Sequence, residues 1–215
     1  MLIESAGAPR GVYVITPDWT DTARLNAAVA GAIRGGAGAV QYRNKAASAA
    51  LRAEQAEALA RLTQSAGLPF FVDDDPILAA AVGADGLHIG RDDGDVVAVR
   101  AKLPPGMLLG VSCYGDLDRV VAAVEAGAAY VAIGVMYPSR TKAGVRSVPV
   151  ERIGQARRLG ACVVASGGIG AGSVAQMAEA GADAVGVVSA VFEAQDPESA
   201  TAALTARFAM GAGQK

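Results

Sequence analysis

Carboxylates follow two neighbouring apolar stretches of this 215-residue chain. Asp73–Asp75 come directly after Pro69–Val72, and Asp92–Asp93 come just after Gly86–Ile89. Carboxylates brought together repel one another unless they are protonated, paired or neutralised by a metal, and an all-oxygen set of ligands suits Mg²⁺. The pattern indicates a magnesium site, with a bare acidic patch on the surface as the alternative.

A short helix is expected between these two acidic clusters. Pro76 suits the first position of a helix, because its φ angle is fixed and it has no N–H to leave unpaired. An alanine-rich segment follows and ends at Gly83. Two strands joined by a helix run parallel, so both clusters are expected at the carboxyl edge of one sheet, where α/β folds place their ligands.

Other polar side chains follow the remaining expected strands and suit anion binding. Gln41, Arg43 and Lys45 alternate in sequence, so they point the same way if their strand continues. Two cations beside several carboxylates suit an anion held together with a divalent metal. The further candidates are Ser112, Ser139, Arg140, Thr141, Lys142, Gly167, Gly168 and Ser189.

The glycines Gly167–Gly168 can bring backbone N–H groups to a phosphate, aided by the N-terminus of the next helix. A metal-held diphosphate on one side and a monophosphate on the other would indicate a site that joins two phosphorylated substrates. Taken singly, each motif has a plainer explanation: a tight turn for GGIG, a solvated rim for QxRxK and a surface loop for SRTKAG.

His88 is the only histidine, which narrows the chemistry. It lies within an expected strand, so a hydrogen-bonded structural role is the favoured interpretation, and a multi-histidine metal site is excluded. Cys113 and Cys162 lie inside apolar runs, without CxxC spacing, and are expected to be buried free thiols. No activating neighbour of Cys113 is visible, so a nucleophilic role is discounted.

Composition and charge limit the class of protein. Apolar residues make up 52% of the chain, aromatic residues 5%, and 27 residues are glycine, which suits helices packed on buried parallel strands. A net charge of −2 without a basic block argues against nucleic acid as a partner, and the apolar runs are too short to span a membrane. The N-terminus lacks the basic start of a secretion signal, so a cytoplasmic protein is expected.

Strands and helices are expected to alternate along the chain. The expected strands are Gly11–Thr16, Gly38–Tyr42, Pro69–Val72, Gly86–Ile89, Met107–Ser112, Tyr130–Ile133, Ala161–Ala165 and Ala184–Val188. Gly-Ala pairs precede the even-numbered strands, where each glycine is placed to end a helix. This repeat predicts one (β/α)8 TIM barrel domain over residues 1–215, with loose ends at about 1–10 and 211–215. The alternative, a doubly wound sheet, lacks a GxGxxG motif after the first strand.

Helix boundaries follow from capping residues and periodicity. A helix capped by Asp21 or Thr22 is expected to run to about Arg34, and a last helix is expected at about Ser199–Met210. In the long helix Ala47–Ser65, the expected buried stripe is Leu51, Ala58 and Leu62.

The order of these motifs resembles that of the thiamine phosphate synthase family, from about Gly11 to Phe192. The motifs read VQYRNK, FVDDDPILAAAVGADGLHIGRDD, GVSCYG, AIGVMYPSRTKAG, ASGGI and VVSAVF. The resemblance implies a (β/α)8 barrel that uses Mg²⁺ to join a hydroxymethylpyrimidine diphosphate to a hydroxyethylthiazole phosphate. It also implies that pyrophosphate leaves first, giving a pyrimidine-stabilised cation that the thiazole nitrogen captures.

The resemblance assigns roles to particular residues. It implies that Asp74 and Asp93 hold Mg²⁺. It implies that the pyrimidine diphosphate is bound by Gln41, Arg43, Lys45, Asp73, Ser112 and Lys142, of which Arg43, Lys45 and Lys142 are catalytic because they neutralise the leaving group. It implies that the thiazole phosphate is bound by Ser139, Thr141, Gly168, Val188 and Ser189.

Some positions depart from the family pattern. Asp73 stands where the family usually has Asn, Arg91 where it has Gln, Tyr114 where it has His, and Val135 where it has Pro. An extra carboxylate at Asp73 would repel a diphosphate, and the guanidinium of Arg91 would offset that repulsion. We therefore hypothesise that Asp73 and Arg91 form a compensating pair.

Two other functions stay open at this point. A thiazole tautomerase-like isomerase of the same barrel would lack the metal carboxylates and would use a histidine where this chain has Tyr114. A catalytically silent phosphate-binding barrel would have little need of Arg43, Lys45 and Lys142. The sequence leaves the oligomeric state open, a homodimer included, and the loop Ser139–Val145 is predicted to close over bound ligands.

Overall fold

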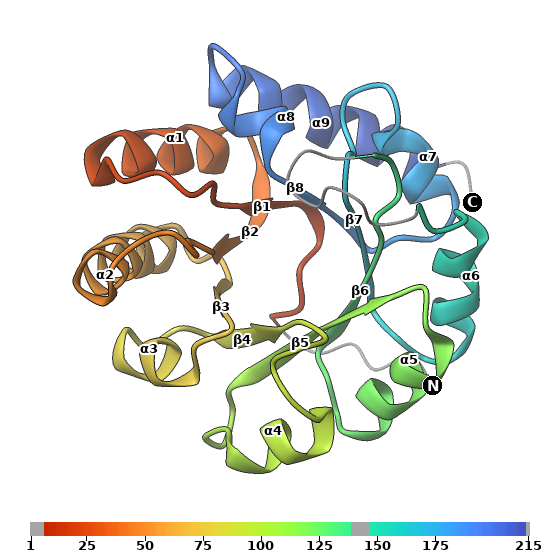
Figure 1. The fold of residues 1–215 in the computed structure, drawn as a ribbon. Helices are drawn as coiled ribbons and strands as arrows, with labels where there is room; N and C mark the ends of the chain where they lie inside the picture. The colour runs from red at the N-terminus through yellow and green to blue at the C-terminus, as the bar shows by residue number, and fades with distance from the viewer. Residues whose placement is uncertain (1–6, 139–146, 214–215) are drawn as a thin grey trace.

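The structure, a computed structural model, describes residues 7–138 and 147–213. Within these residues, eight parallel strands form a closed barrel in chain order, and β8 pairs with β1 (Figure 1). The predicted (β/α)8 barrel is thus confirmed. The strands are β1 (Gly11–Ile15), β2 (Ala37–Tyr42), β3 (Phe70–Asp73), β4 (Gly86–Ile89), β5 (Leu108–Tyr114), β6 (Tyr130–Ile133), β7 (Val163–Ser166) and β8 (Ala184–Val187).

Helices surround the barrel on its outer side (Figure 1). They are α1 (Thr22–Arg34), α2 (Ala49–Ala66), α3 (Pro76–Ala81), α4 (Val96–Lys102), α5 (Leu117–Glu125), α6 (Glu151–Arg158), α7 (Val174–Glu179), α8 (Ser189–Phe192) and α9 (Pro197–Ala212). Asp21, Asp75 and Asp116 cap their helices by accepting hydrogen bonds from backbone N–H groups of the first turn. No helix in the described part of the chain has the length and apolar character needed to cross a membrane.

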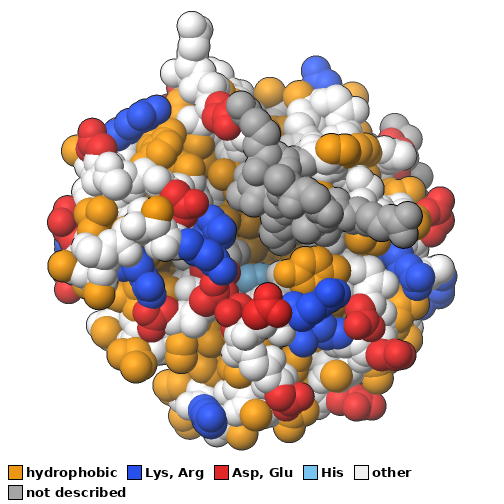
Figure 2. Space-filling view, in the orientation of Figure 1, with side chains coloured by type: hydrophobic (Ala, Val, Ile, Leu, Met, Phe, Trp, Pro, Cys, Tyr) orange, Lys and Arg blue, Asp and Glu red, His pale blue; other side chains and the backbone are white. Residues whose placement is uncertain are grey.

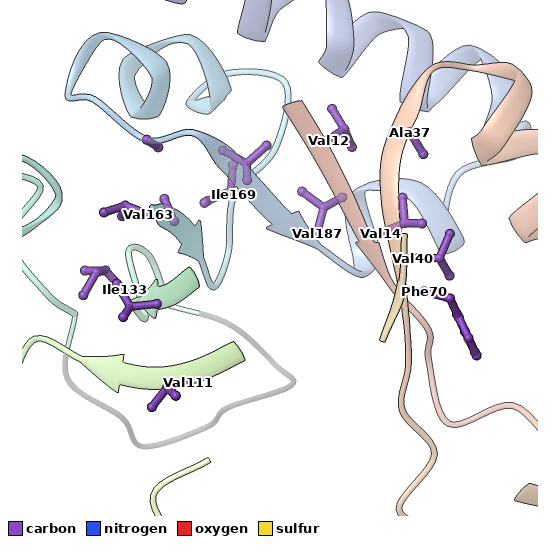
Figure 3. Packing of buried hydrophobic residues seen from close by; sticks show 14 of the residues in the cluster. Val12, Val14, Ala37, Val40, Phe70, Val111, Ile133, Val163, Ile169 and Val187 are labelled. Carbon is purple, nitrogen blue, oxygen red and sulfur yellow. The ribbon is translucent and has the colours of Figure 1, made fainter. Parts of the chain in front are cut away.

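The main core lies between the strands and the helices that surround them. Side chains such as Val14, Val40, Val111 and Val187 leave the barrel outward and pack in this layer (Figure 3). Both faces of these strands are buried, which is why the strands read as nearly continuous apolar runs.

A second, smaller cluster fills the inside of the barrel. The rings of Tyr13, Phe71 and Tyr130 meet edge to face there, with centroids 5.3–5.7 Å apart. Gly110 leaves room for one of them, because an added Cβ would lie 2.2 Å from the ring of Tyr130. These rings and the small residues beside them fill the barrel interior. A pocket stays open at the carboxyl ends of the strands.

The buried face of α2 differs from the predicted stripe. Gln55, Ala56, Leu59 and Thr63 are buried, whereas Leu51, Ala58 and Leu62 are only partly buried. Gln55 faces inward because its side-chain oxygen accepts hydrogen bonds from the Tyr42 hydroxyl and from Asn44 Nδ2, each at 3.0 Å. A polar network, rather than the apolar periodicity, sets this face of the helix.

Candidate functional site

The described candidate residues lie together at the carboxyl ends of the barrel strands. Acidic and basic side chains gather around the barrel mouth (Figure 2). The pocket there is lined by every described residue that the sequence assigned to metal or substrate: Gln41, Arg43, Lys45, Asp73, Asp74, Asp93, Ser112, Gly168, Val188 and Ser189. Ser139, Thr141 and Lys142, and the loop Ser139–Val145 that was predicted to close, lie outside the described residues.

The carboxylates of Asp74 and Asp93 meet in this pocket, although they follow different strands. Lys45 Nζ lies 2.5 Å from Asp74 Oδ2. Burial opposes ionisation of Asp74, but its hydrogen bonds with Asp93 and Lys45 outweigh this effect and lower its pKa. Burial and the hydrogen bond with Asp74 raise the pKa of Asp93. Ionising both carboxyl groups at once is therefore unfavourable without a further positive charge, which a bound cation would supply.

Asp73 is the third carboxylate of this cluster. Burial and the nearby charge of Asp74 raise the pKa of Asp73 to about 7. Gln41 Nε2 donates a hydrogen bond to its Oδ1 atom at 2.9 Å, and Arg43 Nε lies 3.6 Å from its Oδ2 atom.

The structure gives Arg91 a different neighbour from the one hypothesised. Its guanidinium carbon lies over the ring of Tyr114, 4.6 Å from the ring centroid. Among the described residues, Arg43 forms an ion pair with Asp73, and the charge of Lys45 also acts on this carboxylate. A compensating effect of Arg91 on Asp73 stays a prediction, and it would have to act through space rather than through the contacts described here.

Thr16 and Asp18, which follow β1, hold the QxRxK segment in place, and neither was predicted as a site residue. The hydroxyl of Thr16 donates to the backbone carbonyl of Arg43 and accepts from its N–H, each at 2.8 Å. Asp18 Oδ1 accepts from the backbone N–H of Lys45 at 2.9 Å and lies 3.3 Å from Arg43 Nη1. The only sequence signal was that they are polar residues directly after a strand, at the same rim as the other candidates.

A chain of hydrogen bonds crosses the inside of the barrel and joins four residues that line the pocket. The hydroxyls of Tyr13 and Tyr130 lie 2.9 Å apart, the Tyr130 hydroxyl lies 2.8 Å from His88 Nδ1, and His88 Nε2 lies 2.9 Å from Ser112 Oγ. The predicted hydrogen-bonded role of His88 is confirmed. Burial raises the pKa of both tyrosines, so their hydroxyls stay protonated at neutral pH. Neither tyrosine was predicted as a site residue, because the sequence pattern of their strands is that of core residues.

The predicted glycine turn follows β7, and its two glycines adopt a left-handed backbone. Gly167 and Gly168 have φ angles of 92° and 68°, which favour glycine. An added Cβ at Gly168 would lie 2.6 Å from the carbonyl oxygen of Tyr137. Ser189 is the first residue of α8, which follows the neighbouring strand β8. Barrels of this fold frequently bind phosphate with the loops after strands seven and eight. As a short helix of its own, α8 was not predicted.

The donor set at the barrel mouth fits Mg²⁺. In residues 7–138 and 147–213, no group of three or more His, Cys, Asp and Glu side chains is placed to hold a metal ion. Mg²⁺ usually binds through one or two carboxylates, with phosphate oxygens and water completing its shell. Asp74 and Asp93 supply two such carboxylates in contact with each other.

The fold and the site define a (β/α)8 barrel with acidic and basic groups gathered at one mouth. Residues 12–191 match the family described as thiamine monophosphate synthase. The chain belongs to this thiamine monophosphate synthase family.

Relatives match the chain over nearly its whole length. The thiamine-phosphate synthase of Chromobacterium violaceum is 46% identical over 198 residues, which cover 92% of this chain and 96% of the relative. That of Bordetella bronchiseptica is 49% identical over 209 residues, 94% of this chain and 96% of the relative. The solved thiamine phosphate pyrophosphorylase of Pyrococcus furiosus is 31% identical, with a TM-score of 0.83 and coverage of 94% and 96%.

Proposed function

We propose that this chain is a transferase that joins a hydroxymethylpyrimidine diphosphate to a hydroxyethylthiazole phosphate, giving thiamine phosphate and pyrophosphate. The observation that carries this proposal is the meeting of Asp74 and Asp93 with Arg43 and Lys45 in one pocket. The same pocket contains the glycine turn at Gly168. The names of the relatives support the same activity.

The cations of the pocket would stabilise the leaving pyrophosphate. Arg43 is oriented by Asp18, and Lys45 by Asp74, so both are held in place before a substrate binds. Lys142, outside the described residues, would join them. Mg²⁺ held by Asp74 and Asp93 would supply further positive charge to the diphosphate.

The proposed order of bond changes is dissociative. The bond between the pyrimidine methylene carbon and the diphosphate oxygen breaks first, and the electron pair leaves with pyrophosphate. The thiazole nitrogen then donates its own electron pair to the methylene cation. That nitrogen carries no proton, so no general base is needed, which agrees with a pocket whose only histidine is hydrogen-bonded to Tyr130 and Ser112.

The second substrate would lie on the opposite side of the mouth. Backbone N–H groups at Gly168, Val188 and Ser189 would bind its phosphate, and Ser139 and Thr141 would complete this cradle. Gln41, Asp73 and Ser112 would hold the pyrimidine. Holding both substrates in one pocket supplies the proximity on which the second step depends.

Mass spectrometry of the reaction products tests this proposal. The purified chain should form thiamine phosphate only when both substrates and Mg²⁺ are present, and either substrate alone should stay unchanged. Rearrangement of a thiazole substrate alone would favour a tautomerase-like isomerase. Binding of both substrates without product would favour a silent phosphate-binding barrel. An electron-withdrawing substituent on the pyrimidine should slow the reaction if the bond breaks before the nitrogen attacks.

We further propose that the partners of this chain are small phosphorylated molecules and that it works in the cytoplasm, where such substrates would be available. Recovery of the activity in the membrane fraction or outside the cell would contradict that location.

A further inference from the structure

Arg119 joins the ends of two barrel strands from the outside. It lies in the first turn of α5 and is half-buried. Its Nη2 donates to the carbonyl oxygen of Gly90 at 2.6 Å, and its Nε donates to the carbonyl oxygen of Ser112 at 2.9 Å. The planar guanidinium therefore bridges the residue that follows β4 and a residue near the end of β5.

The Gly90 end of this bridge leads to Asp93, one of the two carboxylates that are proposed to bind the cation. The backbone N–H of Gly90 donates to Asp93 Oδ2 at 2.6 Å. The carboxylate lies so close that an added Cβ at Gly90 would be 2.9 Å from the same oxygen. Arg119 binds the carbonyl group of Gly90, and Asp93 binds the N–H group of the same residue. Arg119 therefore restricts the turn that orients the Asp93 carboxylate.

The Ser112 end of the bridge leads to the substrate pocket. Ser112 is held at its carbonyl by Arg119 and at its hydroxyl by His88 Nε2. The Ser112 hydroxyl is thereby fixed relative to the Gly90–Asp93 turn. One arginine outside the pocket thus restrains two groups on the pocket wall.

We propose that Arg119 is a positioning residue for the divalent-cation site, acting through Gly90 on Asp93 and through the backbone on Ser112. This proposal rests on the proposed function only in taking Asp74 and Asp93 as the carboxylates that bind the cation. Arg119 does not touch the reacting atoms. Its effect is to hold the carboxylate in the orientation that binding requires, as outer-shell partners of metal ligands do.

The test measures Mn²⁺ binding by electron paramagnetic resonance, in the presence of pyrophosphate, and needs no turnover. Arg119→Gln should raise the dissociation constant for Mn²⁺ by about tenfold, which is the size of effect expected from loss of an outer-shell partner. Arg119→Lys should give a smaller rise, because an ammonium on a flexible stem cannot reproduce the two-pronged fork. Asp93→Ala serves as the reference for loss of the carboxylate itself.

Arg100 offers a matched control. It lies on the neighbouring helix α4 and donates to the carbonyl oxygens of Met107 and Pro104, at 2.7 and 3.3 Å, beside the amino end of β5. Arg100→Gln removes a similar bridge at the end of the barrel opposite the pocket. It should leave Mn²⁺ binding within about twofold of the unaltered protein, whatever it does to the melting temperature.

Activity gives a second readout. The Mg²⁺ concentration for half-maximal pyrophosphate release should rise in Arg119→Gln, while KM for the thiazole phosphate stays unchanged. Unaltered Mn²⁺ affinity in folded Arg119→Gln would overturn the proposal, and if that variant does not fold, unaltered affinity in Arg119→Lys would do so. Equal weakening by Arg100→Gln would also overturn it. A chain that binds Mn²⁺ with this dependence on Arg119, yet forms no product, would contradict the proposed function alone.

Discussion

Lys45 Nζ lies 2.5 Å from Asp74 Oδ2, so a cation that follows β2 neutralises a carboxylate that follows β3. The hydrogen bond with Asp74 is the main cause of the raised pKa of Lys45, which therefore stays charged at neutral pH. A metal ion bound to Asp74 would compete with this ion pair. Lys45 would then be released toward the diphosphate that the metal ion brings with it.

Substitution of Lys45 separates these two roles. Without pyrophosphate, Lys45→Ala should bind Mn²⁺ more tightly, because the competing ammonium is gone. Pyrophosphate release should fall by about a hundredfold, because a group that stabilises the leaving charge is lost. Arg61→Ala, which breaks an exposed pair with Glu57, is the control. Weaker Mn²⁺ binding in Lys45→Ala would contradict the competition.

Gly90→Ala should displace the Asp93 carboxylate with little cost to the fold. The added Cβ would press on the far end of a flexible side chain, and the backbone of Gly90 is outside the left-handed region. We expect weaker Mn²⁺ binding and a melting temperature within a few degrees of the unaltered protein. The control is Gly172→Ala, whose Cβ would meet nothing within 4 Å. Unchanged metal binding in Gly90→Ala would show that Asp93 does not bind the cation.

Gly168→Ala should affect the thiazole phosphate more than the pyrimidine diphosphate. At a φ angle of 68°, an alanine costs on the order of 1 kcal/mol, and its Cβ would also meet the Tyr137 carbonyl. We expect KM for the thiazole phosphate to rise about tenfold.

Gly67→Ala isolates the backbone cost of that substitution. Gly67 has a φ angle of 66°, ends α2 and has open space around its Cα. It should lose a similar 1 kcal/mol or so in the free energy of unfolding, with no change in either KM. An unchanged KM for the thiazole phosphate in Gly168→Ala would remove this turn from the phosphate cradle.

The two thiols should be inert in the folded protein. Burial raises the pKa of Cys113 to about 12, and that of Cys162 likewise to about 12. At pH 8 only about one thiol in ten thousand would be ionised, and the thiolate is the reactive form. A disulfide reagent should therefore label neither residue until the protein unfolds, and activity should survive the treatment. Rapid labelling of Cys113 with loss of activity would reopen its dismissed role as a nucleophile.

The residues that could be predicted from the sequence are those that directly follow a strand. Asp74, Arg43 and Gly168 were found because parallel strands end at one rim, so their position in the chain gives their position in the fold. Tyr13 and Tyr130 lie inside strands, where a polar tip cannot be told from core. Their roles depend on contacts across the barrel that a linear pattern does not record.

Contacts with neighbouring elements, and in one case the short length of a helix, account for the other differences. Gln55 faces the core because Tyr42 and Asn44 bind it there, which overrides the apolar stripe of α2. Arg119 reads as an exposed helix residue, and its bridge to Gly90 joins residues that are 29 positions apart. α8 spans only residues 189–192, which is too short to show a helical period.

The most direct test of the central claim is pyrophosphate release by the purified protein, measured with each substrate alone, with both, and with both in the absence of Mg²⁺. Asp74→Ala is measured in parallel, with its fold checked by thermal unfolding. We predict release only with both substrates and Mg²⁺, and loss of that release in Asp74→Ala. Mg²⁺-independent release, or full activity in folded Asp74→Ala, would contradict a metal-assisted synthase at this barrel mouth.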